Sequence, residues 1–292
     1  MIQEKLNVPE FEPNPNFRDV TLFTGTFYGE DDASRLRQQL ALDMFDQTDK
    51  TGVKIIVSDG GSNNDFLYLA STHPSVVLIH EPVGSTMGES RRFALDKAID
   101  DAATDPKHIF MWLEPEKVNL ADADAITTLV TPIREGKADV VVPRRIDKST
   151  LPKQQAWLES RANHRATKLM KSEDPESPNK EGDEDLDLWY GPKVFNKAGA
   201  EYFSRYKGKL DKWDSIIAPV LQAYKGGLEV ASVPVDFTYP TAQSTFETDN
   251  KIFKRKRVEQ YGSILIALGD TFWQEHELTG AGIAKTSAKP KQ

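Results

Sequence analysis

The sequence lacks cysteine altogether and has only five histidines among its 292 residues. Without cysteine, neither a disulfide framework nor a thiolate metal site can form, which fits a reducing compartment. The histidines are scattered, with no HxxxH or HExxH pair, and this disfavours a histidine-based zinc site. No segment reaches the roughly 20 consecutive apolar residues of a membrane-spanning helix. The N-terminus has neither the basic start nor the apolar run of a signal peptide. We therefore expect a cytoplasmic protein without an integral membrane segment.

Positive charge is also scarce relative to negative charge. The chain has 37 Lys and Arg residues against 45 Asp and Glu residues, a net charge of -8 at pH 7. This balance opposes indiscriminate binding to DNA, RNA or anionic lipid, so nucleic acid is not an expected partner. The sequence carries no indication of oligomeric state.

The length and the hydrophobic content favour one large domain with elaborations. Hydrophobic residues make up 38% of the chain and are spread over many short runs, as in globular α/β proteins. We predict an N-terminal extension (1–16), a single domain (17–275) whose halves are 17–145 and 146–275, and a flexible, disordered tail (276–292) rich in Gly, Ala, Lys and Pro.

Within that domain, apolar runs alternate with segments of helical spacing. Leu36, Leu40 and Met44, for example, share one face of a predicted helix. This alternation predicts an α/β fold with a mostly parallel central sheet flanked by helices, and a ligand site outside the carboxyl ends of the strands. The polar segment 171–187 is interpreted as a mobile loop or lid. The predicted strands are 20–23, 53–57, 76–79, 108–113, 138–143 and 228–237, and further helices are predicted up to 170 and at 198–206 and 213–224.

The strongest local pattern is Leu113-Glu114-Pro115-Glu116, which directly follows a predicted buried strand. In an extended backbone, side chains two residues apart point the same way, so both carboxylates can converge on one cation. Hard oxygen ligands of this kind suit Mg²⁺ or Mn²⁺ held jointly with phosphate oxygens. The competing interpretation is that the two acids cap the next helix.

Two glycine-containing loops follow other predicted strands. Asp59 lies in a loop with Gly60 and Gly61, where a ligand could approach closely and the carboxylate could accept from a nucleobase or ribose. The alternative is that Asp59 only completes its own turn. The segment 84–92 enters a helix and contains Arg91, so its backbone N–H groups and that arginine favour a nucleotide phosphate or ribose. A generic helix start is the alternative there.

The order of these motifs resembles the GT-A glycosyltransferases, particularly the family 2-like group of the nucleotide-diphospho-sugar transferases. The resemblance covers roughly Val20 to Phe237, and it rests on the segments 24–30, 58–62, 84–92 and 114–116. It implies a GT-A fold with an acceptor-side elaboration. By position it also implies that Thr26, Glu30, Asp59 and Gly60 hold the nucleoside and that Arg91 braces the nucleotide-sugar. Glu116 would be the principal metal ligand, with Glu114 contacting ribose or metal.

The chain departs from the family pattern at both acidic positions, where Glu114 and Glu116 stand in place of aspartates. Each arm is longer by one bond of about 1.5 Å, which implies a retracted loop or an altered metal dependence. Pro115 stiffens the pair. Tyr28 and Arg92 stand where the family's first and third motifs carry asparagine.

The second half is similar to the acceptor side of the same fold. Trp189 and Gly191 lie in the segment that the family places under the donor sugar, and Trp189 is also a candidate stacking platform. Asp214 opens a helix where inverting members carry the catalytic base. It could instead serve only as an acid at a helix N-terminus. The order of motifs is shared with retaining glucosyl- and mannosyl-glycerate-type synthases as well, so the sequence leaves inverting and retaining mechanisms open.

A run of four cations, 254–257, follows a polar loop at 239–250 that could fold over the donor. Arg255 and Arg257 in this run are candidates for binding the diphosphate or an anionic acceptor. A solvated helix face is the competing interpretation.

Together these patterns predict a metal-dependent glycosyltransferase that moves a sugar from a nucleotide-diphosphate donor, UDP- or GDP-linked, to a hydroxyl acceptor with Mg²⁺ or Mn²⁺. Two alternatives stay open. One is a sugar nucleotidyltransferase, although the first loop lacks the cations that this class would place there. The other is a non-catalytic nucleotide-sugar- or carbohydrate-binding GT-A protein that has lost the strict Asp-x-Asp pair.

Overall fold

The computed structural model describes residues 10–171 and 186–272, apart from 238 and 249. The predicted tail 276–292, nearly all of the predicted lid 171–187 and the first part of the extension lie outside these residues. Within the described part of the chain, no helix is long and apolar enough to cross a membrane.

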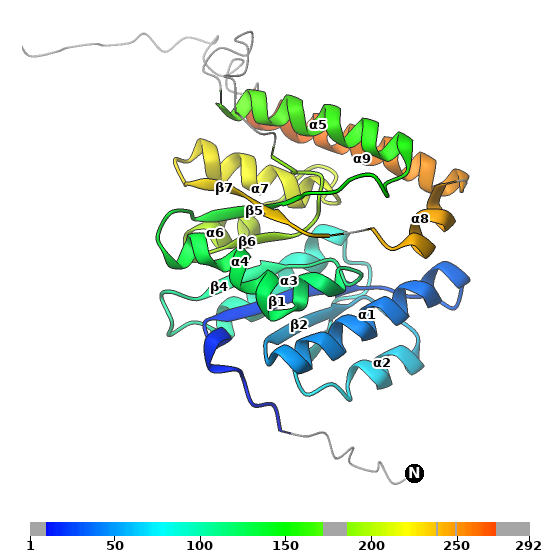
Figure 1. Ribbon diagram of the computed structural model, residues 1–292, viewed down its shortest axis with the longest axis vertical. Coiled ribbons are helices and arrows are strands. Elements are labelled where there is room, and N and C mark those ends of the chain that lie inside the picture. Colours follow the sequence, from blue (N-terminus) through cyan, green and yellow to red (C-terminus); the bar gives the residue numbers. More distant parts are fainter. Residues whose placement is uncertain (1–9, 172–185, 238, 249, 273–292) are drawn as a thin grey trace, which may run out of the picture.

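The centre of the molecule is a seven-stranded sheet in the order β3-β2-β1-β4-β6-β5-β7 (Figure 1). β6 is antiparallel to β4 and β5, and the other neighbouring strands pair in parallel. Strands from both predicted halves thus share one sheet, and the predicted fold class is confirmed. The strands are β1 (Val20–Thr26), β2 (Lys54–Asp59), β3 (Val76–His80), β4 (Ile109–Trp112), β5 (Val140–Arg145), β6 (Lys193–Phe195) and β7 (Val230–Val235).

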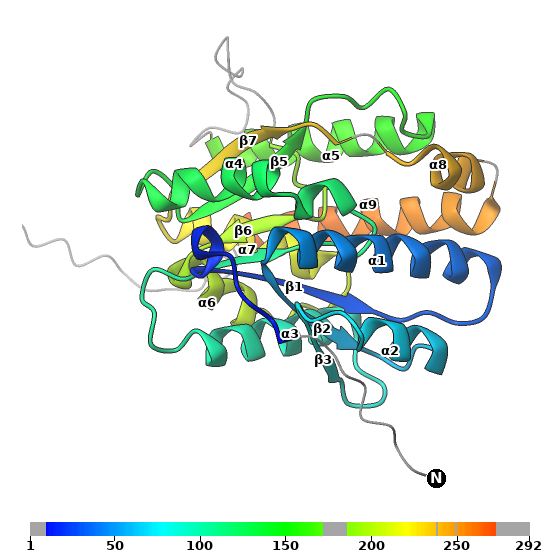
Figure 2. The ribbon, with the colours of Figure 1, turned by 60° about the horizontal axis from the view of Figure 1, so that its bottom comes forward.

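Helices cover both faces of this sheet and form two separate core clusters. One cluster buries side chains of α1, α2 and α4, and the other those of α3, α5, α6, α7 and α9. α5 and α9 lie side by side, and α8 packs against α9 (Figures 1 and 2). The helices are α1 (Asp32–Thr51), α2 (Asn64–Ala70), α3 (Met87–Asp101), α4 (Ala123–Arg134), α5 (Lys153–Lys171), α6 (Lys197–Arg205), α7 (Asp214–Lys225), α8 (Thr241–Thr248) and α9 (Lys251–Phe272), with short 3-10 turns at Pro15–Phe17 and Val118–Ala121.

Local sequence fixes where the first helices begin and end. The Asp31 side chain accepts from the backbone N–H of Ser34 and caps α1, while Gly52, at φ 69°, closes it in the left-handed conformation that favours glycine. Thr86 and Glu89 form a reciprocal capping box at the start of α3. β1 and β2 are buried on both faces, which explains why they read as nearly continuous apolar runs.

All six predicted strands correspond to strands of the structure, but several elements were not predicted, among them α2, α4, β6 and α8. β6 is only three residues long and begins with a lysine, so it has no apolar run to reveal it. α8 occupies what was interpreted as a polar loop at 239–250. Its sequence is polar because its buried contacts are hydrogen bonds and ion pairs, in which Glu247 takes part.

Candidate functional site

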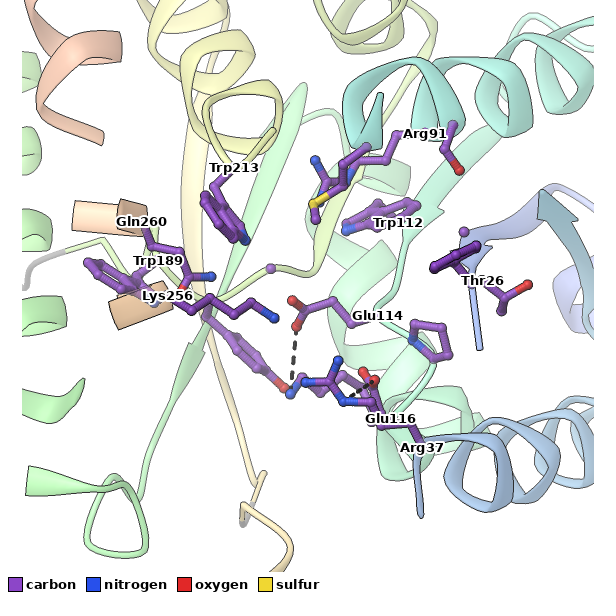
Figure 3. Close-up of a pocket in the computed structure, with 18 of the residues that line it drawn as sticks. Thr26, Arg37, Arg91, Trp112, Glu114, Glu116, Trp189, Trp213, Lys256 and Gln260 are labelled. Carbon is purple, nitrogen blue, oxygen red and sulfur yellow. Dashed lines mark ion pairs between the residues drawn. The ribbon is translucent and has the colours of Figure 1, made fainter. Parts of the chain in front are cut away.

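A cavity of about 620 Å³ lies at the carboxyl edge of the sheet, where β1, β2 and β4 end. Its opposite wall comes from the second half of the chain, including α9 and the segment before β6 (Figure 3). Eight of the twelve side chains predicted to form the site line this cavity, namely Thr26, Gly60, Arg91, Glu114, Glu116, Trp189, Gly191 and Arg257. Glu30, Asp59, Asp214 and Arg255 are not among its lining residues.

The carboxylates of Glu114 and Glu116 follow β4 directly and border the cavity. Glu114 points into the centre of the space, and both acids have a cation beside them (Figure 3). The Glu114 Oε2 to Lys117 Nζ distance is 3.6 Å, and Glu116 Oε1 lies 3.5 Å from Arg37 Nε. These distances are longer than those of hydrogen-bonded ion pairs. Both carboxylates therefore keep oxygen lone pairs directed at the cavity.

Glu114 is ionised at neutral pH despite its surroundings. Burial alone would raise its pKa, but the nearby cations of Lys117 and Arg91 bring the pKa below its usual value. A pair of carboxylates beside a cavity fits Mg²⁺ or Mn²⁺, which prefer hard oxygen ligands and often take only one or two from the protein. Glu116 and Glu114 are thus the residues here that would hold such an ion.

A second acidic group occurs elsewhere, among Asp46, Asp49 and His73. None of these three lines the cavity. Asp49 accepts from the backbone N–H and the hydroxyl of Ser75 and lies 2.8 Å from His73 Nδ1. These contacts hold the turn before β3 onto α1, which accounts for the cluster without an ion.

Basic side chains from both halves of the chain face the two acids. Arg37 of α1, Lys117 after β4, and Lys256 and Arg257 of α9 all line the cavity. Lys256 extends toward Glu114 (Figure 3). Burial, together with the neighbouring cations Arg37 and Arg257, lowers the pKa of Lys256 to about 8. Such a concentration of cations in a chain of net negative charge favours an anionic ligand with several charges.

Arg257 and Arg255, predicted together, have different environments. Arg257 Nη2 donates to Glu247 Oε2 at 2.6 Å, and Glu247 is buried. Arg37 Nη2 approaches the other oxygen of Glu247 at 3.6 Å, so Glu247 joins α1, α8 and α9 at the cavity edge. Arg255 is exposed on α9 and pairs with Glu259. The position of Arg255 agrees with the competing interpretation, a solvated helix face.

Asp59 lies outside the cavity lining and holds its own loop in shape through hydrogen bonds. It is buried, and its oxygens accept from the backbone N–H groups of Gly61 and Ser62, both at 2.8 Å, and from the Thr26 hydroxyl at 2.7 Å. The geometry favours the alternative in which Asp59 completes its own turn and orients Thr26. Glu30 is exposed and lies outside the cavity lining.

Glu81, which sequence reasoning did not identify, lies beside this loop. It lines the cavity after β3, and its Oε2 accepts from the Ser58 hydroxyl at 3.0 Å. A Cβ atom at Gly60 would collide with Glu81 Oε1, so glycine at this position makes room for the carboxylate. The exposed ring of Phe27 lines the same part of the cavity.

The start of α3, predicted to receive a phosphate, is held by the chain's own Asp211. The Asp211 carbonyl accepts from the Gly88 N–H at 2.8 Å, and its carboxylate accepts from the Thr86 hydroxyl and from both terminal nitrogens of Arg92. Asp211 has φ 49°, a conformation that non-glycine residues rarely adopt. These contacts fasten the turn before α7 to α3.

Arg91 lines the cavity and fastens the same turn. Its Nη1 donates to the Lys212 carbonyl and to the Ser215 hydroxyl at 2.6 Å, and its guanidinium lies 5.1 Å from the centre of the Trp112 ring. Burial lowers the pKa of Arg91 to about 10, although Glu114 acts in the opposite direction. Arg91 therefore holds the turn that presents Trp213 to the cavity.

Asp214 faces that turn and is buried. Its carboxylate accepts from the Lys212 N–H at 2.8 Å and from the Tyr206 hydroxyl at 2.8 Å. These contacts favour the structural interpretation, an acid that closes the start of α7, over the predicted role of catalytic base.

The segment before β6, for which the resemblance implies a place under the donor sugar, forms one wall of the cavity. Trp189, Tyr190 and Gly191 line the cavity, and a Cβ atom at Gly191 would lie 2.7 Å from Glu114 Oε2. Only glycine lets the backbone approach the carboxylate this closely. The motif order in the sequence pointed to Gly191. It did not point to Arg37 and Lys256, because only the tertiary structure brings these two residues to the cavity.

No protein-family model and no curated protein matches the chain. Solved structures do. Glucosyl-3-phosphoglycerate synthase from M. tuberculosis superposes with a TM-score of 0.57 at 12% identity, over 87% of this chain and 80% of that one. The same enzyme in complex with Mn²⁺, uridine diphosphate and glucosyl-3-phosphoglycerate gives a TM-score of 0.53 at 12% identity, over 87% and 79%. Its complex with phosphoglyceric acid gives the same values. The chain thus has a GT-A glycosyltransferase fold, as the sequence predicted.

Proposed function

We propose that this protein transfers a sugar from a nucleoside-diphosphate donor to a hydroxyl acceptor, with Mg²⁺ or Mn²⁺ held by Glu116 and Glu114. The observation that carries the proposal is the pair of carboxylates after β4, which faces cations of α1 and α9 across one cavity. A carboxylate pair suits the metal, and the surrounding cations suit a diphosphate.

In this reaction the bond between the sugar C1 and the diphosphate oxygen breaks and a bond from C1 to the acceptor oxygen forms. The nucleoside diphosphate leaves, and the acceptor hydroxyl gives up its proton to water or to the leaving diphosphate. When bound, the divalent cation supplies a positive charge against the leaving diphosphate. Lys117, Lys256 and Arg37 add further positive charge at the same edge. These groups are held in place before reaction, so they stabilise the developing charge without reorganisation.

Uridine is the nucleoside to test first, because the solved structures of similar fold include complexes with uridine diphosphate and Mn²⁺. Phosphoglyceric acid, present in another of those complexes, is the first acceptor to test. An anionic acceptor of this kind is compatible with Lys256, which makes no ion pair with a described residue.

The proposal is tested by thermal shift with UDP-glucose, GDP-mannose and the free diphosphates, each with Mn²⁺ or with EDTA. A ligand that binds only the folded state stabilises it by about 2.7 kcal/mol at a hundredfold excess over Kd. We expect a metal-dependent shift with one nucleotide class in the wild type, and its loss in Glu116→Gln. The control is Glu135→Gln, which changes an exposed, ion-paired glutamate outside the cavity and should keep the shift.

A non-catalytic nucleotide-sugar-binding protein is the second candidate. The observation that favours it is that both carboxylates have a cation of the protein beside them, while Asp214 is occupied by its own turn. A metal-dependent shift without release of nucleoside diphosphate from any acceptor tested would favour binding alone. No shift with any nucleotide-sugar would reject both candidates.

A further inference from the structure

Lys193, the first residue of β6, is fully buried in the middle of the sheet. It pairs in register with Trp112, the last residue of β4, and none of its surface is exposed. Lysine is almost never buried completely without a partner, because an ammonium group loses its hydration there. No ion pair joins Lys193 to any residue in the described ranges. Its position therefore needs another explanation.

The partners of Lys193 are the backbone carbonyls of a single loop. Its Nζ donates to the carbonyls of Pro192 at 3.1 Å, of Leu188 and Gly191 at 3.3 Å each, and of Tyr190. One ammonium group thus gathers four of the five carbonyls between residues 188 and 192. A loop whose carbonyls turn inward toward one point would repel itself without a donor at the centre.

This loop is also the cavity wall against which Glu114 lies. Trp189, Tyr190 and Gly191 line the cavity, and Gly191 contacts the Glu114 carboxylate. The outer side of the segment is anchored independently, since the Trp189 N–H donates to Asn163 Oδ1 at 2.9 Å. Lys193 supplies the contacts on the inner side.

We propose that Lys193 is a positioning residue, whose ammonium group holds the loop 188–192 in the shape that places Gly191 against Glu114 and Trp189 at the cavity. Lys193 holds the loop in this way in the free protein, without a ligand. The effect of Lys193 on sugar transfer rests on the proposed function.

The charge of Lys193 is poised to change near neutral pH. Burial lowers its pKa to about 7, and the fixed charges around it act in both directions: Asp187 and Glu114 raise the pKa, whereas Arg145 and Arg91 lower it. The neutral amine has one donor fewer, but it no longer loses the hydration of a charge. Opening the loop hydrates the amine and returns its pKa toward 10.5, so the held loop gains stability relative to the open loop as the pH rises through about 7.

Global stability responds to the same titration with the same sign. The unfolded chain keeps its proton up to the ordinary lysine pKa of 10.5, so between about 7 and 10.5 it binds more protons than the folded chain. The contribution of Lys193 to stability consequently rises with pH across this window. A lysine that stays buried when the loop opens would not give loop opening this pH dependence.

The test compares wild type with Lys193→Met by hydrogen exchange of the peptide covering the loop, at about pH 6 and about pH 8.5, after correction for the intrinsic exchange rate. In the wild type we expect corrected exchange about tenfold slower at the higher pH. In Lys193→Met we expect fast exchange at both pH values. Lys197→Met is the matched control, because Lys197 also donates to a backbone carbonyl, that of Ala103, but lies outside the cavity.

Equal loop exchange at both pH values in the wild type would overturn the inference, and this arm needs no variant that folds. A loop in Lys193→Met that exchanges as slowly as the wild type would overturn it as well. If the protein proves active, kcat/KM for the donor should fall by about 10- to 100-fold in Lys193→Met. Loss of loop order without any nucleotide-sugar binding would retain the positioning role and reject only the proposed function.

Discussion

Two groups of charged residues on the same side of the sheet have opposite organisation. Arg145, Asp187 and Glu159 are buried and joined by hydrogen bonds of 2.6–3.0 Å. Glu114 and Glu116, by contrast, lie 3.5–3.6 Å from their cations and border the cavity. The first group is saturated by its own partners, whereas the second keeps capacity for a ligand. Charged groups that are fully paired thus form part of the cavity wall, whereas groups that are incompletely paired can still bind a ligand.

The largest expected effect on stability comes from breaking the saturated group with Asp187→Asn. Removing one partner leaves Arg145 buried and incompletely paired, which should lower the free energy of unfolding by roughly 3–5 kcal/mol. Urea denaturation measures this difference. An unchanged unfolding midpoint would mean that the buried pair does not support the fold.

The same residue gives an expected pH dependence. Burial would raise the pKa of Asp187, but Arg145 and Lys148 lower it from 3.8 to about 2. A carboxylate with a lowered pKa stabilises the fold fully above its unfolded value and loses that contribution as the pH falls through the folded value. We therefore expect an acid-induced loss of stability between about pH 4 and pH 2 that is smaller in Asp187→Asn, measured by thermal unfolding across this range.

The unsaturated pair should show the reverse behaviour. Glu114→Gln is expected to reduce turnover by about 10²–10³-fold, because it removes a charge directed at the leaving diphosphate and its metal. Its melting temperature should stay close to that of the wild type, since the Lys117 contact is long and partly exposed. A variant that unfolds early but keeps its specific activity would assign Glu114 to the fold and not to the site.

Gly191→Ala probes the boundary between the two groups. The added Cβ would lie 2.7 Å from Glu114 Oε2, so the carboxylate must move away from its position in the cavity. We expect kcat/KM to fall about tenfold or more. Gly262→Ala in α9 is the control, because nothing lies within 4 Å of a Cβ there and the fold should gain roughly 0.4–1 kcal/mol. Equal activities of the two variants would show that the close approach of Gly191 has no role.

The smallest effect is expected on α9. Arg257→Ala should weaken donor binding because it frees buried Glu247 from its nearest cation, whereas Arg255→Ala should change stability by no more than about 0.5 kcal/mol and leave binding unchanged. Donor titration of both variants by calorimetry measures the contrast. Weaker binding in Arg255→Ala would restore this residue to the site.

The sequence alone predicted those parts of the fold in which apolar runs mark the strands. β1, β2, β4 and β5 are buried strands bounded by polar loops, whereas β3 and β7 are partly buried strands at the two edges of the sheet. Their alternation with helices leaves few topologies. β6 escaped prediction because its core position is held by Lys193, whose partners are backbone carbonyls with no sequence pattern.

The sequence pointed to residues that line the cavity where carboxylates directly follow a strand, as at Glu114 and Glu116. It was not predicted where distant segments meet. Arg37 reaches Glu116 and Glu247 from α1, and no local spacing reveals that contact. Asp59 shows a second limit of the prediction. A carboxylate that follows a strand can accept hydrogen bonds from its own loop or bind a ligand, and the sequence does not distinguish the two.

The most direct test of the account is a crystal structure of the protein soaked with UDP and Mn²⁺. We expect an anomalous peak for Mn²⁺ beside Glu116 and Glu114, with the diphosphate between this ion and the cations of α1 and α9. UDP bound outside this cavity, or Mn²⁺ bound at Asp46, Asp49 and His73 while the cavity stays empty, would contradict it.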